Sequence, residues 1–62
     1  MNWEQYEVWS TADNHDELVG ATKSLKQARQ MAKNALHNGA EYVIIYREID
    51  DGELEIVEEL PP

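Results

Sequence analysis

The sequence predicts an α+β fold with the element order β-β-α-β-β, in which one helix packs on one face of a four-stranded, mainly antiparallel sheet. Three observations support this prediction: a helical repeat of apolar residues in mid-chain, a hairpin signal at Asp51-Gly52, and loosely alternating segments before the helix. The chain has 62 residues, so a single small acidic domain over residues 1–62 is expected.

Two strands are expected before the helix. Residues 4–11 alternate loosely between apolar and polar positions, with Glu7 and Trp9 on the same face. Residues 12–16 are mostly polar and predict a turn. Residues 17–22 then predict a second, weaker strand.

The helix is predicted over residues 25–38. Ser24 and Gln27 have capping-box spacing, in which the Ser24 hydroxyl accepts from the backbone N–H of residue 27 and the Gln27 side chain reaches back. Asn38-Gly39 supply the left-handed residue that ends many helices. Between these signals the apolar residues recur every three or four positions, as on one buried helix face: Leu25, Ala28, Met31, Ala32, Ala35 and Leu36.

The last two strands are expected to form a hairpin. Residues 42–46 are β-branched or aromatic, and residues 53–57 alternate. A two-residue type I′ turn at Asp51-Gly52 sets the favoured register: Ile49 opposite Leu54, Arg47 opposite Ile56, and Ile45 opposite Glu58. A three-residue turn with Gly52 in a bulge would shift the pairing by one residue.

The favoured register separates the hairpin into two faces. One face carries most of the aliphatic residues: Val43, Ile45, Ile49, Leu54, Ile56 and Leu60. The other face combines aromatic, apolar and acidic residues: Tyr42, Ile44, Tyr46, Val57, Glu48, Glu53, Glu55 and Glu59. This register also leaves Arg47 on the aliphatic face, which counts against it.

Charge is segregated along the chain, whose formal net charge is −8. Residues 1–21 carry −5, residues 22–40 carry +4, and residues 41–62 carry −7. The predicted helix is therefore basic, and both hairpins are acidic.

Several functional classes lack support in the sequence. The chain has no cysteine, which excludes disulfides, thiolate catalysis and cysteine-based zinc sites. No metal-ligand spacing, P-loop, GxGxxG or GxSxG motif occurs, so neither a metal, another cofactor nor an enzymatic activity is expected. No apolar run approaches membrane-spanning length and the N-terminus lacks signal-peptide features, so a cytoplasmic location is expected.

The leading hypothesis is a non-enzymatic protein-binding module. One helix covers only one face of a sheet, and tyrosines left on the other face are suited to protein interfaces. An acidic-aromatic sheet face would contact a basic protein partner. The expected partner-binding residues are Tyr42, Tyr46, Glu48, Asp50, Asp51, Glu53, Glu55 and Glu59. The uncovered face also predicts a homodimer, because a chain this short has a thin core.

Two alternatives concern nucleic acids. Alternate strand residues lie about 6.8 Å apart, so the hairpin acids would form rows spaced somewhat like backbone phosphates. In size, charge and acid spacing the chain resembles the small acidic proteins, often from phages, that mimic nucleic acid and inhibit DNA- or RNA-binding and defence proteins. The second alternative is weak nucleic-acid binding through the basic helix, which the acidic pI near 4.4 opposes. The simplest reading of the acids is that they prevent aggregation of a small sheet.

Overall fold

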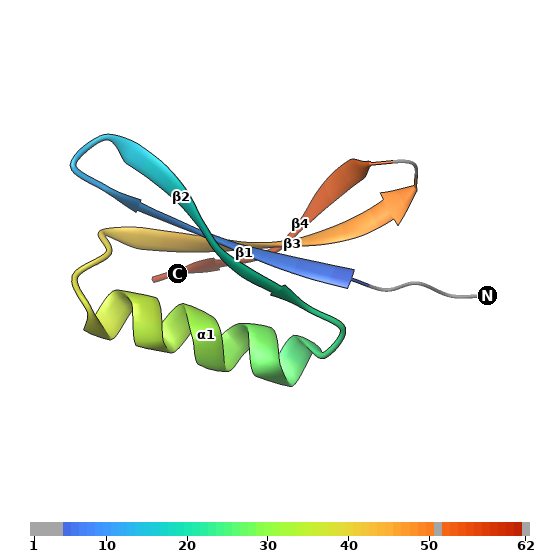
Figure 1. Ribbon diagram of the computed structural model, residues 1–62, viewed down its shortest axis with the longest axis horizontal. Helices are drawn as coiled ribbons and strands as arrows, with labels where there is room; N and C mark the ends of the chain where they lie inside the picture. Colours follow the sequence, from blue (N-terminus) through green and yellow to red (C-terminus); the bar gives the residue numbers. More distant parts are fainter. Residues whose placement is uncertain (1–4, 51, 62) are drawn as a thin grey trace.

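The computed structural model describes residues 5–50 and 52–61. Within these residues it contains β1 (Gln5–Ala12), β2 (His15–Thr22), α1 (Leu25–His37), β3 (Tyr42–Asp50) and β4 (Glu53–Leu60). Neighbouring strands are all antiparallel, in the order β2-β1-β3-β4, and α1 lies along one face of the sheet (Figure 1). The predicted α+β fold and its element order are confirmed.

A two-residue turn joins β1 to β2. Asp13 and Asn14 have φ angles of 53° and 61°, so both central residues occupy the left-handed region, as a type I′ turn requires. Asp and Asn enter this region more readily than other non-glycine residues. The turn is tighter than the sequence predicts, and β2 consequently begins at His15.

The predicted N-cap of the helix is confirmed. The Ser24 hydroxyl accepts a hydrogen bond from the Gln27 backbone N–H at 3.2 Å. In a capping box, the Gln27 side chain would accept a hydrogen bond from the Ser24 backbone N–H. Here the Ser24 N–H donates instead to the Thr22 hydroxyl at 3.2 Å. That hydroxyl donates in turn to the Gln27 side-chain oxygen at 2.9 Å. Thr22 therefore connects the end of β2 to the first turn of α1.

A Schellman motif ends the helix after His37. The Ala40 N–H donates to the Ala35 carbonyl, and the Gly39 N–H donates to the Leu36 carbonyl, both at 3.1 Å. Gly39 has a φ of 109°, which glycine adopts without a Cβ clash. These bonds satisfy the last helical carbonyls and turn the chain back toward β3.

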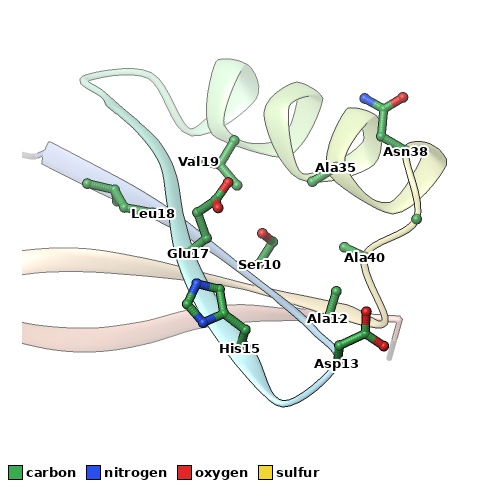
Figure 2. A pocket seen from close by; sticks show the side chains of 11 residues that line it. Ser10, Ala12, Asp13, His15, Glu17, Leu18, Val19, Ala35, Asn38 and Ala40 are labelled. Carbon is green, nitrogen blue, oxygen red and sulfur yellow. The ribbon is translucent and has the colours of Figure 1, made fainter.

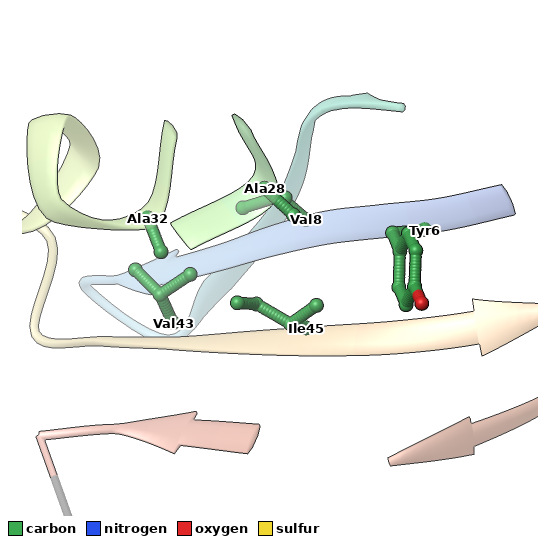
Figure 3. Packing of buried hydrophobic residues seen from close by; sticks show 6 residues of the cluster. All are labelled: Tyr6, Val8, Ala28, Ala32, Val43 and Ile45. Carbon is green, nitrogen blue, oxygen red and sulfur yellow. The ribbon is translucent and has the colours of Figure 1, made fainter. Parts of the chain in front are cut away.

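The core lies between α1 and the two central strands. Its buried residues are Tyr6, Val8, Ala28, Ala32, Val43 and Ile45 (Figure 3). Short alanine side chains let α1 approach the sheet closely, and Gly20 on β2 gives room to Met31, whose Cε would lie 2.5 Å from a Cβ at that position. The predicted apolar face of the helix is confirmed, because all six of its residues are buried or pack against the core.

The second hairpin has the predicted register at its two ends only. Asp50 pairs with Glu53 across a two-residue turn, and Ile45 pairs with Glu58 as predicted. The pairing skips Ile49 on β3 and Val57 on β4, so that each forms a β-bulge. Because the two bulges lie on opposite strands, their offsets cancel. The type of the turn depends on residue 51, which is outside the described residues.

Between the two bulges, the prediction of which residues share a face of the sheet is wrong. Arg47 pairs with Glu55 instead of Ile56, and the two side chains form an ion pair. Leu54 and Ile56 consequently lie on the side of the sheet away from α1, with Glu48 and Tyr46 respectively as their partners on β3. The physical reason is the arginine: the favoured register would have set its guanidinium against an aliphatic side chain, whereas the bulges provide a carboxylate.

We expect Ser24→Ala to lower the free energy of unfolding by about 1 kcal/mol, because it removes the side-chain acceptor at the helix start. Urea denaturation followed by circular dichroism measures this. Lys33→Ala, an exposed change in the same helix, is the control and should alter stability by less than about 0.5 kcal/mol. Equal midpoints and slopes for wild type and Ser24→Ala would refute the capping role.

Candidate functional site

The sheet face opposite α1 is not covered by any helix or strand of the described residues (Figure 1). We call it the open face. Strand pairing places these side chains on it: Gln5, Glu7, Trp9 and Thr11 from β1; Asp16, Leu18 and Ala21 from β2; Tyr42, Ile44, Tyr46 and Glu48 from β3; Leu54, Ile56 and Glu59 from β4. The open face is therefore apolar and aromatic as well as acidic.

A groove of about 340 Å³ runs over the open face. It is lined by Trp9, Thr11, Asp16, Tyr42, Ile44, Tyr46 and Leu54. The β1–β2 turn, the end of β3 and the start of β4 lie on the side of the sheet away from α1 (Figure 1), so the sheet curves away from the helix at both of these places. Bulges in both hairpins explain this shape, because each bulge bends its strand and increases the local twist.

The apolar side chains of the open face are accessible to a partner. Tyr42 is 44% exposed, Leu54 41% and Ile56 54%, although each lies beside other apolar groups. An exposed apolar patch with a polar rim is typical of a site that binds another molecule. Tyr and Trp strengthen this indication, because they bury a large area and keep one polar group for a partner.

Four carboxylates surround the groove, and we call Glu7, Asp16, Glu48 and Glu59 the rim acids. Glu7 lies on β1 and Glu59 on β4, so these two flank the apolar row of β3 on both sides. Asp16 and Glu48 lie toward opposite ends of that row. The open face carries no lysine or arginine among residues 5–50 and 52–61. Its rim is therefore negative on every side.

Two hydrogen bonds order the β1 side of the groove. The Trp9 indole N–H donates to the Glu7 carboxylate at 3.0 Å. The Thr11 hydroxyl donates to the Asp16 carboxylate, and this bond crosses from β1 to β2. Each rim acid involved is thus held beside the apolar floor, so the face presents charge and apolar surface together.

Half of the expected partner-binding residues lie on the open face: Tyr42, Tyr46, Glu48 and Glu59. The prediction that Glu55 shares this face is wrong, because its pairing with Arg47 places it on the α1 side.

The remaining expected residues lie around the second turn. Asp50 and Glu53 pair with each other at the end of the hairpin, beyond the groove. Asp51 lies outside the described residues. The prediction that Glu53 and Glu55 form one row with the open-face acids is therefore not met, since the segment between the bulges presents Leu54 and Ile56 instead.

Alternation along the strand did not identify the groove residue Leu54 or its neighbour Ile56. The favoured register placed both on the aliphatic face, yet they lie on the open face. The signal that could have found them is the conflict at Arg47, since any register that pairs it with Glu55 turns both aliphatic residues over.

A second groove, of about 560 Å³, lies between the first hairpin and the C-terminal end of α1 (Figure 2). Short side chains leave this space open: Ser10, Ala12, Ala35 and Ala40. Three exposed titratable side chains also line it: Asp13, His15 and Glu17. Nowhere in the described part of the chain do three histidine, aspartate or glutamate side chains gather closely enough to hold a metal ion.

The outer side of α1 carries the basic residues. Lys26, Arg29 and Lys33 are exposed, and the Arg29 Nε lies 2.9 Å from a Glu58 carboxylate oxygen on β4. This ion pair withdraws one cation from the basic surface that the sequence suggested for nucleic acid. With regard to membranes, none of the described residues forms a helix long and apolar enough to cross one.

No family model, curated protein or solved structure matches this chain.

We expect Glu55→Lys to destabilise the protein by about 0.5–1 kcal/mol, because it replaces the ion-pair partner of Arg47 with a second cation. Glu53→Lys makes the same charge change beside the turn and should have less than half of this effect. Chemical denaturation of the two variants gives the comparison. Equal unfolding free energies would show that the Arg47–Glu55 pair contributes nothing.

Proposed function

We propose that the protein is a non-enzymatic protein-binding module that contacts a basic partner protein through the open face. One observation supports this above all: an exposed groove with an aromatic and aliphatic floor is surrounded by four acids, and none of the described residues places a base on the same face. The apolar floor would supply affinity, and the rim acids would select the charge of the partner.

The form of the groove favours a macromolecule over a small substrate. Small-molecule sites are concave pockets that bury most of their ligand. Here the groove opens onto a sheet face, and neighbouring apolar residues such as Leu18 and Ile56 extend beyond it. A partner protein would cover the floor and these flanking residues together.

The negative net charge of the whole chain also favours a basic partner. A net charge of −8 on 62 residues attracts basic partners over several ångströms and raises their association rate at low salt. The rim acids would then hold the partner's cations at the contact itself.

The alternative of nucleic-acid mimicry was based on rows of evenly spaced carboxylates, and the strand pairing does not produce such rows on the open face. Mimicry needs rows of carboxylates on one surface, but Glu55 is paired with Arg47 on the α1 side and Glu58 is paired with Arg29. The acids that remain on the open face alternate with apolar residues, as in a protein interface.

The test is capture of a partner followed by measured binding of the purified partner to designed variants. The double variant Tyr42→Ser, Leu54→Ser should weaken binding at least about tenfold, because both side chains line the groove. Both are exposed, so the fold should survive. Binding should also weaken steeply as salt rises.

Two matched controls locate the contact. Val19→Ser, Ile49→Ser removes equally exposed apolar residues outside the groove and should leave affinity within about twofold. Lys26→Glu, Lys33→Glu reverses the charge of α1 and should not weaken binding of a basic partner. Loss of binding in the helix variant, with binding retained in the groove variant, would overturn the proposal.

A further inference from the structure

We infer that the segment of the partner that occupies the groove is a cationic amphipathic helix lying along β3. This inference rests on the proposed function and specifies the partner's structure and chemistry. It follows from the hydrogen bonding of the sheet, the positions of the rim acids, and the charge of the open face.

The backbone of the sheet favours a helix over an extended segment. The floor of the groove is formed mainly by β1 and β3, which are the two central strands. Each pairs with a strand on both sides, so their N–H and C=O groups are used within the plane of the sheet. A segment lying on the face finds no backbone partners below it. A helix satisfies its own backbone groups, whereas an extended chain would leave them unpaired where it loses water.

The rim acids match the width of a helix. Glu7 on β1 and Glu59 on β4 flank β3 and lie two strand spacings apart across the strands, or about 10 Å. Along β3 they are offset by two residues, because Glu7 pairs with Tyr46 and Glu59 pairs with Ile44. The diameter of a helix with its side chains is also about 10 Å. Cationic side chains on either flank of a helix above β3 would therefore reach Glu7 on one side and Glu59 on the other.

The floor sets the spacing of the partner's apolar residues. Tyr42, Ile44 and Tyr46 follow one another on the same face of β3, about 6.8 Å apart. Successive helical residues at i, i+4 and i+8 are about 6 Å apart along the axis. A narrow apolar stripe of this period fits the row, and Lys or Arg on both flanks of the stripe meets the rim acids.

A second copy of this chain fits the groove less well. Two open faces brought together would set the rim acids of one copy against those of the other, with no base from either face within the described residues. The helix of a second copy has basic residues, but its exposed side is polar and offers no apolar stripe to the floor.

The experiment uses a synthetic peptide of about 16 residues built from leucine, lysine and alanine, long enough to form a helix on binding. Its leucines recur every three or four positions, with lysines on both flanks. One comparison peptide has the same composition with leucines distributed around the helix, and another alternates leucine and lysine as a strand does. Binding is followed by the anisotropy of a labelled peptide and by Trp9 emission in a Trp3→Phe background, while peptide circular dichroism reports helix formation.

The expected result is binding of the amphipathic peptide with gain of helicity and a change in Trp9 emission. Both comparison peptides should bind at least about tenfold more weakly, because they lack a helical apolar stripe. Tyr42→Ser, Leu54→Ser should weaken binding by a similar factor.

Charge variants test the role of the rim acids. Glu7→Gln, Glu59→Gln should weaken binding about fivefold and reduce its salt dependence, and glutamine keeps an oxygen acceptor for the Trp9 indole. Glu17→Gln, Glu53→Gln removes the same charge away from the groove and should change affinity by less than about twofold.

Three outcomes overturn the inference: equal binding of the scrambled peptide, tighter binding of the strand-like peptide, or sedimentation showing that a second copy occupies the face at the concentrations used.

The failures of the two proposals are distinguishable. If the captured partner depends on Tyr42 and Leu54 but the helical peptide does not bind, the proposed function stands and the helical occupant is wrong. If neither ligand responds to these substitutions, both proposals fail.

Discussion

A single helix of 13 residues closes the core of a four-stranded sheet, and it does so by placing Ala28 and Ala32 against the central strands. Their small side chains permit a close approach, and six of the described residues are buried in the core. No helix among residues 5–50 and 52–61 lies on the other face. Seven large apolar or aromatic side chains of these residues therefore remain on that face, and this distinctive surface is a direct result of how the core is closed.

The features that could be predicted from the sequence are those specified by neighbouring residues. The helix depends on the Ser24 cap, the apolar repeat and the Gly39 stop, and each acts within a few positions. The bulges at Ile49 and Val57 are different, because they follow from a contact between strands, in which Arg47 meets Glu55. Alternation within one strand contains no information about such a partner.

The same distinction, between features set by neighbouring residues and features set by contacts between strands, explains which groove residues were predicted. Tyr42, Ile44 and Tyr46 were placed together correctly, since residues two apart on a regular strand share a face. Leu54 was assigned to the opposite face, because its orientation depends on a shift in β4 and not on its own neighbours. Groove residues on regular strands were therefore predictable from alternation alone, whereas those between the bulges could be found only by considering the cross-strand partner of Arg47.

The cancelling offsets of Ile49 and Val57 divide the second hairpin into parts that can vary independently. Residues 43–45 and 58–60 keep the register that builds the core, whatever happens in the segment between the bulges. Leu54 and Ile56 contribute to the open face without entering that core. Substitutions in this segment can therefore alter the open face while the end of β4 keeps its place beside the core. The pair of bulges thus separates the hairpin residues that build the core from the apolar residues that the hairpin presents on the open face.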